Sequence, residues 1–322
     1  MAKSNTSLLI GATGFIGRHL AGYLADYGEK VIGTYFDYKP DDRDLTAKVR
    51  YVRCDVRQKK SLESLVARYR PRDIYFLSAQ SSVRESWFDP VNTMNINFMA
   101  GLYLLEYLRK TKSNSRLMIF SSGTTYGDSF RANRALDEEA AQKPKDPYSV
   151  SKFAIDVLAR RYAKVYGLDA KVVRLANIMG PGQSPLFSLT NFARQLALIR
   201  AGRQPKMIRV GNISSSRDYL DVRDCVRAIR LVMKKGRPGQ AYHVCSGKSR
   251  KLSDVLKEIV RCSGFSNNQI KVIKKQALMS KDEIPAVRLN PGKLRKLTGW
   301  KPEILFVKSL KDILDHAERE AV

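Results

Sequence analysis

The stretch Ser7-Leu-Leu-Ile-Gly-Ala-Thr-Gly-Phe-Ile-Gly17 decides the fold. An apolar strand, Ser7 to Ile10, runs directly into glycines spaced G-x-x-G-x-x-G, and residues 18–27 after them have the periodicity of an amphipathic helix. Glycines at such a turn let backbone approach a pyrophosphate, which the positive end of the following helix attracts. The stretch predicts a dinucleotide-binding turn, with a purely structural βα turn as the alternative. The residues expected to line the cofactor here are Gly11, Thr13, Gly14, Phe15, Ile16 and Gly17.

Apolar strands alternate with helical segments as far as Leu175. The further strands are expected at 30–35, 50–54, 73–78, 117–120 and 171–175. This alternation is typical of a parallel sheet covered by helices on both faces, so the sequence predicts an α/β fold with a Rossmann-type doubly wound sheet. Pro and Gly cluster after Asn177, which indicates a smaller C-terminal α/β substrate lobe. We expect residues 1–176 to form the NAD(P)-binding domain, residues 221–245 to return to it, and residues 177–220 and 246–322 to form the lobe.

Two acidic residues follow the second and third strands. Asp37 lies where an acid would bind the adenosine ribose, but Lys39 and Arg43 are near enough in sequence to offer cations to a 2′-phosphate, so NADH and NADPH both remain open. Asp55 could accept a hydrogen bond from the adenine amino group, with Val56 beside it, or could cap the helix expected at 61–69.

Small and polar residues follow the fourth strand, where a cofactor and a substrate can lie close to the backbone. The candidates are Leu77, Ser78 and Ala79 for the cofactor and Ser82 for the substrate. The helix expected at 91–110 carries Asn97 on an apolar face, and a buried asparagine there is expected to bond backbone or water behind the site.

Tyr148 and Lys152 are four residues apart at the start of a helix expected at 148–165, so both side chains lie on one helical face. A neighbouring cation would lower the pKa of the phenol toward the neutral range, which suits acid–base chemistry. Ser122 follows the fifth strand and is expected beside Tyr148 at the carboxyl edge of the sheet. The alternatives are a surface tyrosine with a lysine reaching into solvent, and a serine that only turns the chain.

The formal charge of +27 raises nucleic acid as a partner, but the basic residues are spread along the whole chain, which favours a generally basic surface. Four cysteines and three histidines show no metal-ligand spacing, so no metal is expected. No apolar run approaches the roughly 20 residues of a membrane helix, and we expect a cytoplasmic protein without membrane insertion.

Several motifs together resemble the extended short-chain dehydrogenase/reductases that act on nucleotide sugars. They are the glycine turn 11–17, Ser121-Ser-Gly-x-x-Tyr-Gly127, Tyr148-x-x-x-Lys152, Arg174-x-x-Asn177 with Gly180-Pro-Gly-Gln183, and residues 217–224. The resemblance implies that Ser122, Tyr148 and Lys152 are catalytic with NADPH or NADH, and that relatives pair as homodimers through the two long helices. It also implies that Asn177 and Arg217 hold the nucleotide sugar, with Ser82, Ser122 and Thr124 lining the sugar. Without the resemblance, Arg217 could form a surface ion pair with Asp221 or Asp224.

The C-terminal half is similar to bacterial GDP-4-keto-6-deoxy-D-mannose reductases that form GDP-D-rhamnose, which favours a GDP-linked substrate. Ser280 and Lys281 depart from that pattern, because they stand where those relatives carry an arginine. Gly123 and Thr124 stand where related 4,6-dehydratases carry acids, so dehydration, which needs an acid and a base, is disfavoured. The sequence therefore predicts reduction of a 4-keto-6-deoxy sugar nucleotide. Nucleotide-sugar 4-epimerisation is the nearest alternative, and a nonenzymatic nucleic-acid-binding protein a more distant one.

Overall fold

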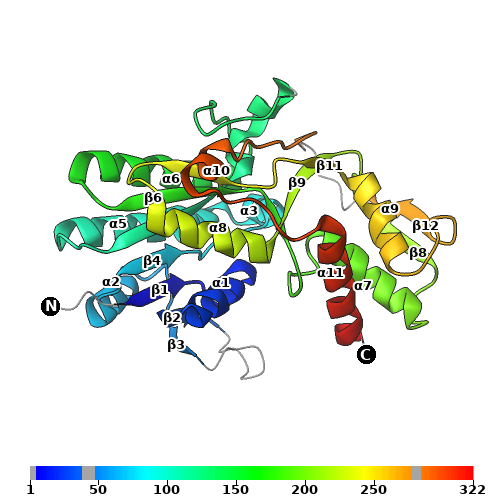
Figure 1. Ribbon diagram of the computed structural model, residues 1–322, viewed down its shortest axis with the longest axis horizontal. Coiled ribbons are helices and arrows are strands. Elements are labelled where there is room, and N and C mark those ends of the chain that lie inside the picture. Colours follow the sequence, from blue (N-terminus) through cyan, green and yellow to red (C-terminus); the bar gives the residue numbers. More distant parts are fainter. Residues whose placement is uncertain (1–4, 38–47, 133, 277–283, 322) are drawn as a thin grey trace.

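The computed structural model describes residues 5–37, 48–132, 134–276 and 284–321. Seven parallel strands form its main sheet (Figure 1). Their bounds are β1 Thr6–Ile10, β2 Lys30–Tyr35, β3 Val49–Arg53, β4 Asp73–Phe76, β5 Arg116–Ser122, β6 Ala170–Leu175 and β10 Ala241–Val244. Their order is β10-β6-β5-β4-β1-β2-β3, so the chain reverses direction across the sheet between β1 and β4. A doubly wound sheet binds ligands outside the carboxyl ends of its strands at such a point, and the predicted fold class is confirmed.

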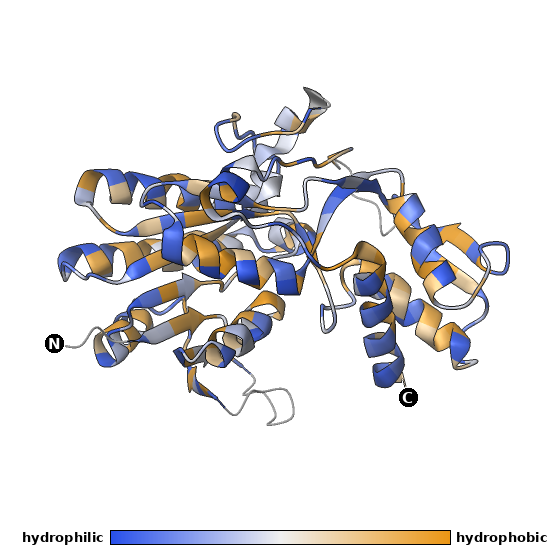
Figure 2. Ribbon diagram, in the orientation of Figure 1, coloured by the Kyte–Doolittle hydropathy of each residue, from blue (hydrophilic) through white to orange (hydrophobic). Residues whose placement is uncertain are grey.

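Helices cover both faces of this sheet. One core contains side chains of α1 (Phe15–Asp26) and α8 (Val222–Lys235), which pack against each other. The other contains side chains of α2 (Lys59–Tyr69), α5 (Ala100–Lys110) and α6 (Pro147–Tyr166). In Figure 2, orange marks hydrophobic residues, and orange segments recur along the strands between these two layers of helices. The alternation of strands and helices therefore buries the apolar side chains of each strand on both faces.

Among the described residues, the smaller lobe contains two short sheets with helices packed around them (Figure 1). β7 (Asn177–Met179), β9 (Ser216–Asp221) and β11 (Ser249–Lys251) form one sheet, and β8 (Met207–Val210) pairs with β12 (Lys271–Lys274) in the other. A third core joins side chains of α7 (Ser188–Arg200), α9 (Leu252–Cys262) and α11 (Phe306–Ala321).

One helix of the 246–322 stretch lies with the main sheet instead of the lobe. Helix α10 (Gly292–Thr298) packs on α8 and β10, and Leu294 and Trp300 belong to the same core as α1 and α8. The Trp300 indole N–H donates to the carbonyl of Asp224 at 3.2 Å. Helix α10 therefore packs with the main sheet, although it belongs to the stretch 246–322 that the sequence assigned to the lobe.

The helix predicted over 91–110 is interrupted by a π-helical turn. It consists of α4 (Pro90–Met94), the π-helix η2 (Asn95–Met99) and α5, and it is preceded by the short α3 (Val83–Phe88). Such turns occur frequently at functional sites. Among the described residues, no helix is both long and apolar enough to span a membrane.

Candidate active site

Ser122 and Tyr148 meet at the carboxyl edge of the main sheet. Ser122 is the last residue of β5, and Tyr148 is the second residue of α6. The start of α6 is fixed by Asp146, whose carboxylate accepts from the backbone N–H of Ser149 at 2.8 Å, and by Pro147 in the first turn. Burial raises the pKa of Tyr148 to about 12, and a hydrogen bond with Ser122 acts in the opposite direction. Tyr148 is therefore protonated at neutral pH.

Lys152 lies one turn after Tyr148 on the same face of α6 but contacts the backbone of β5. Its ammonium donates to the carbonyl of Phe120 at 2.9 Å, and burial lowers its pKa to about 8. The groups that shift the pKa of Tyr148 are Ser122 and Asp146 besides burial, and Lys152 is not among them. The pKa of Tyr148 is therefore not lowered toward the neutral range as expected, because the loss of hydration around the phenol raises it.

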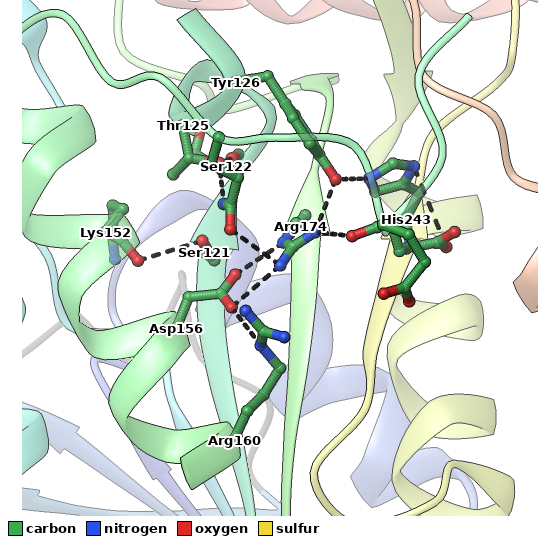
Figure 3. Close-up of polar contacts among 12 residues, drawn as sticks. Ser121, Ser122, Thr125, Tyr126, Lys152, Asp156, Arg160, Arg174 and His243 are labelled. Carbon is green, nitrogen blue, oxygen red and sulfur yellow. Dashed lines mark hydrogen bonds and ion pairs between the residues drawn. The ribbon is translucent and has the colours of Figure 1, made fainter. Parts of the chain in front are cut away.

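Ser121 and Thr124, the neighbours of Ser122, form further hydrogen bonds around the candidate catalytic residues. The hydroxyl of Ser121 donates to the carbonyl of Lys152 at 3.2 Å and so joins β5 to α6 (Figure 3). The Ser122 hydroxyl oxygen accepts from the Thr124 hydroxyl at 2.9 Å and from the Thr124 backbone N–H at 3.2 Å. The Ser122 oxygen thus faces Thr124 and Tyr148, and it keeps its own proton for one further acceptor.

Asn97 lies fully buried in the π-helical turn and bonds backbone, as the sequence predicted. Its amide oxygen accepts from the Gln80 N–H at 2.9 Å, and its amide nitrogen donates to the Gln80 carbonyl at 3.0 Å and to the Ser151 hydroxyl at 2.9 Å. Ser151 in turn donates to the carbonyl of Tyr148 at 2.7 Å. Asn97 therefore connects the loop after β4 to the first turn of the helix that carries Tyr148 and Lys152.

The glycine turn after β1 fits a dinucleotide phosphate. A side chain at Gly17 would place its Cβ only 2.2 Å from the carbonyl oxygen of Gly11, so the turn closes tightly on the start of α1. The first turn of α1 contains no acidic residue, and Gly14 at its N-cap offers no side-chain hydrogen bond. An anion could therefore approach the free N–H groups at this helix end. The turn residues Thr13, Phe15 and Ile16 are each half-buried.

The two acidic residues expected near the adenosine follow β2 and β3. Asp37 is exposed at the end of β2. Asp55 does not cap α2, whose N-cap is Gln58, because both of its oxygens accept from Arg57 at 2.9 Å. The Arg57 guanidinium also lies 4.9 Å from the ring centre of Phe36. Asp55 is thus paired with an arginine two residues later, and its contact with the adenine stays a prediction. Lys39 and Arg43 lie outside the described residues.

The remaining cofactor candidates follow β3 and β4. Val56 is buried in the core, and Leu77 packs against the other core. The backbone N–H of Ser78 donates to the carbonyl of Ile10 at 2.8 Å, so the loop after β4 begins beside the glycine turn. Ala79 is half-buried there. The hydroxyl of Ser82 accepts from the Glu85 N–H at 3.2 Å and caps α3, which is a structural role in addition to the predicted substrate contact.

Asn177 and Arg217 come together around one cavity of about 110 Å³. The cavity lies between β7, β9 and the start of α7 and is also lined by Gln183, Phe187 and Ser215. It unites both residues that the resemblance assigned to the nucleotide sugar, although they are far apart in sequence.

The alternative role of Arg217 as a surface ion-pair partner is not supported. Its guanidinium donates to the carbonyl of Ile284 at 2.8 Å. Asp221 and Asp224 instead accept from Arg223 and Arg227 at 2.8 and 2.9 Å. Ser280 and Lys281, close in sequence to Ile284, lie outside the described residues.

Sequence reasoning missed Ser215 as a residue of this cavity. Its hydroxyl is buried, lines the cavity and has no hydrogen-bond partner among the described residues. Ser215 lies in the middle of three consecutive serines, Ser214 to Ser216. No local pattern distinguishes the middle serine from its neighbours, because the pairing of β9 decides which side chain faces inward.

Within the described part of the chain, no group of three or more His, Cys, Asp or Glu residues could hold a metal ion. The four cysteines are free thiols. The site is therefore built from hydroxyls, amides and cations around a crevice of the parallel sheet.

The comparisons with known proteins cover nearly the whole chain. A family model described as GDP-mannose 4,6 dehydratase matches residues 8–313. GDP-6-deoxy-D-mannose reductase of Pseudomonas aeruginosa is 32% identical over 308 residues, which cover 96% of this chain and 95% of the relative.

Two solved structures are similar in both sequence and shape. The structure of RMD from Pseudomonas aeruginosa complexed with NADPH has a TM-score of 0.83 at 30% identity and covers 98% of this chain and 99% of that chain. The structure of Thermus thermophilus UDP-glucose 4-epimerase with NAD has a TM-score of 0.85 at 27% identity and covers 98% of this chain and 100% of that chain.

Proposed function

The chain belongs to the extended short-chain dehydrogenase/reductases that modify nucleotide sugars with NAD(P), and within this family we propose that it reduces a 4-keto-6-deoxy sugar nucleotide. The observation that carries the proposal is the hydrogen bond between Ser122 and a protonated Tyr148, followed by Gly123 and Thr124 in place of acids. Reduction needs a proton donor at the keto oxygen, and it needs neither the acid nor the base of a dehydratase.

Each catalytic residue has one task in this reaction. A bound nicotinamide nucleotide would supply the hydride to C4 of the sugar. Tyr148 donates its phenolic proton to O4, and Ser122 donates a hydrogen bond to the same oxygen as negative charge develops. Lys152, held by the Phe120 carbonyl and cationic near neutral pH, holds the ribose next to the nicotinamide. The glycine turn 11–17 binds the pyrophosphate.

The first experiment measures NADPH and NADH oxidation with a GDP-4-keto-6-deoxy sugar as substrate. Wild-type protein is expected to oxidise the cofactor, and Tyr148→Phe is expected to lose a factor of roughly 10² to 10⁴ in kcat while still binding cofactor. Thr124→Val is a useful companion variant, because it keeps Tyr148 and removes one hydroxyl beside Ser122. Full turnover by Tyr148→Phe would exclude the proposed mechanism.

The competing function is 4-epimerisation. Its first step removes a hydroxyl proton from the sugar and needs the phenolate, so the raised pKa of the buried Tyr148 favours reduction, which needs the phenol. The Pseudomonas reductase structure also shares 30% identity with this chain, against 27% for the Thermus epimerase. Incubation with UDP- or GDP-sugars without added cofactor tests the alternative, since an epimerase that recycles a bound cofactor would turn over and a reductase would not.

The finer assignments rest on the reductase similarity. The relative of 32% identity acts, by its name, on a GDP-linked 6-deoxy sugar, and the RMD structure holds NADPH. We therefore favour GDP-linked substrate and NADPH, with NADH as the alternative. We also place the reaction in the cytoplasm, without nucleic acid as a partner.

We further propose that two copies pair through the face formed by α4, α5 and α6. Helices α4 and α6 pack against each other, and their outward side chains include Val91 and Val150, which are 70% and 41% exposed. Trp87 and Phe88 on α3 extend the same apolar region, since α3 contacts both α4 and α6. Light scattering on wild type and Val91→Glu tests this pairing: the wild type is expected at twice the chain mass and the variant closer to one.

A further inference from the structure

Arg174 lies in β6 beneath the candidate catalytic residues and is 1% exposed (Figure 3). All five of its N–H donors have acceptors. Nε and Nη2 donate to the two Asp156 oxygens at 2.7 and 3.1 Å, Nη1 to the Tyr126 hydroxyl and the Glu138 carbonyl, each at 2.6 Å, and Nη2 also to the Gln142 amide oxygen at 3.1 Å. The guanidinium therefore has no freedom to rotate without breaking a buried hydrogen bond.

The hydrogen bonds that leave Arg174 through Gln142 have a fixed direction. Because a guanidinium only donates, the amide oxygen of Gln142 must face it, and the amide nitrogen then faces Thr125, where it donates to Oγ1 at 2.6 Å. The Thr125 hydroxyl oxygen accepts that hydrogen bond, so the hydroxyl must donate its own hydrogen to a different acceptor. It donates to the carbonyl of Ser122 at 2.7 Å. A continuous chain of donors thus runs from Arg174 to the backbone of the candidate catalytic serine.

The other end of Arg174 holds the helix with the remaining catalytic residues. Asp156 is fully buried on α6, one turn after Lys152 and two turns after Tyr148. Arg174 therefore fixes α6 through Asp156 and the end of β5 through Gln142 and Thr125. The distance between the Ser122 hydroxyl and the Tyr148 phenol depends on both connections.

We propose that Thr125 and Gln142 are positioning residues that set Ser122 in register with Tyr148 and Lys152. Neither residue was marked by the sequence motifs, and neither touches the reacting atoms. Thr125 is fully buried and Gln142 half-buried. A misplacement of about 1 Å in such a group can cost on the order of 10² in rate, so loss of the relay is expected to act on kcat rather than on cofactor binding. The proposal rests on the proposed function for its kinetic readout only.

The test compares Thr125→Val with Thr125→Ser. Valine has nearly the shape of threonine but neither donates nor accepts, whereas serine keeps the hydroxyl. We expect Thr125→Val to lower kcat at least tenfold, with the dissociation constant for NADPH within about twofold of wild type, and Thr125→Ser to restore kcat to within about threefold. A general loss of packing would instead affect the serine variant more, because only serine removes the buried methyl group. Equal kcat for wild type and Thr125→Val would overturn the proposal.

Gln142→Glu gives a second test in case the valine variant does not fold. A carboxylate at residue 142 still accepts from Arg174 but also accepts from Thr125, so it draws the Thr125 proton away from the Ser122 carbonyl. We expect kcat to fall at least tenfold, as for Thr125→Val, and wild-type kcat in this variant would contradict the relay.

Amide hydrogen exchange of the peptide 121–127, measured without substrate, separates this proposal from the proposed function. Faster exchange in Thr125→Val but not in Thr125→Ser supports the relay even if the wild type reduces no keto sugar. Unchanged exchange in Thr125→Val together with an active wild type would overturn the relay and leave the reductase function standing.

Discussion

The ammonium of Lys152 donates to the carbonyl oxygen of Phe120 at 2.9 Å, so the buried cation on α6 is held by the backbone of β5. Lys152 is 4% exposed, and burial lowers its pKa from 10.5 to about 8. The chain therefore maintains a charged group where hydration is nearly lost, which costs folding free energy.

Lys152→Met is expected to stabilise the fold and to abolish activity. Because the folded pKa lies below the unfolded value, the wild-type penalty is fully present below about pH 8 and disappears as the pH rises toward 10.5. The variant should gain about 3 kcal/mol in the free energy of unfolding at pH 7, and less at pH 10. Urea unfolding at both pH values measures this. Lys164→Met, an exposed lysine on the same helix, is the control and should change little. A variant less stable than wild type at pH 7 would contradict the prediction.

His243 should make the protein sensitive to acid. Its ring nitrogen Nδ1 lies 3.1 Å from the carbonyl oxygen of Asn290, and Nε2 lies 2.7 Å from the Tyr126 hydroxyl. Burial, with Arg174 nearby, lowers its pKa from 6.5 to about 3. Below pH 6.5, His243 binds a proton in the unfolded chain but remains neutral in the folded chain until the pH approaches 3.

Between pH 6 and pH 4, the neutral His243 should therefore lower the wild-type free energy of unfolding by about 1.4 kcal/mol for each unit that the pH falls. His243→Gln removes the titrating ring and should flatten that part of the pH dependence. Unfolding free energies of both proteins at pH 7, 6 and 5 test this, and parallel curves would show that His243 is not the cause.

Gly127→Ala should unfold or strongly destabilise the chain. Gly127 has a φ of +45°, and a Cβ there would lie 1.8 Å from the carbonyl oxygen of Lys143. Lys143 directly follows Gln142, which donates to the Thr125 hydroxyl. The matched control is Gly264→Ala, with a φ of +84° and no atom within 4 Å of the added Cβ. The control should cost about 1–2 kcal/mol, the left-handed backbone penalty alone, and Gly127→Ala clearly more. Similar melting temperatures for the two variants would contradict the close contact.

Ser215→Ala should stabilise the free protein and weaken substrate binding. A buried hydroxyl without a partner costs about 1–3 kcal/mol, and a ligand polar group in the 110 Å³ cavity would recover that cost. Ser249→Ala is the control, because its hydroxyl also lacks a partner among the described residues but does not line the cavity. Both variants should melt at higher temperature than wild type, and only Ser215→Ala should raise KM. An unchanged KM would show that the Ser215 hydroxyl does not contact the substrate.

Local sequence signals predicted much of the fold. The strands and α6 were predictable because apolar periodicity, a proline in the first turn and the glycine after Tyr166 act within a few residues. The lysine–tyrosine spacing likewise placed both residues on one face. The π-helical turn around Asn97 was not predictable, since residues 91–110 have an ordinary helical pattern.

The electrostatics of the site could not be read from spacing. Burial raises the pKa of Tyr148 and lowers the pKa of Lys152. The burial of both side chains follows from tertiary packing. The polar network of Arg174 could not be predicted from the sequence either, because its acceptors come from three separate segments, the turn at Tyr126, the loop with Glu138 and Gln142, and α6.

The pairing of β10 with β6 has a consequence for synthesis of the chain. Residues 241–244 complete the main sheet only after the chain has passed through the first part of the lobe, and until then the buried strand β6 has one open edge. During translation that edge, with Val172 and Val173 beside it, stays available to other chains until residue 244 has left the ribosome. Fragments that stop at residue 220 would therefore be prone to aggregate, although they contain every residue of the catalytic set.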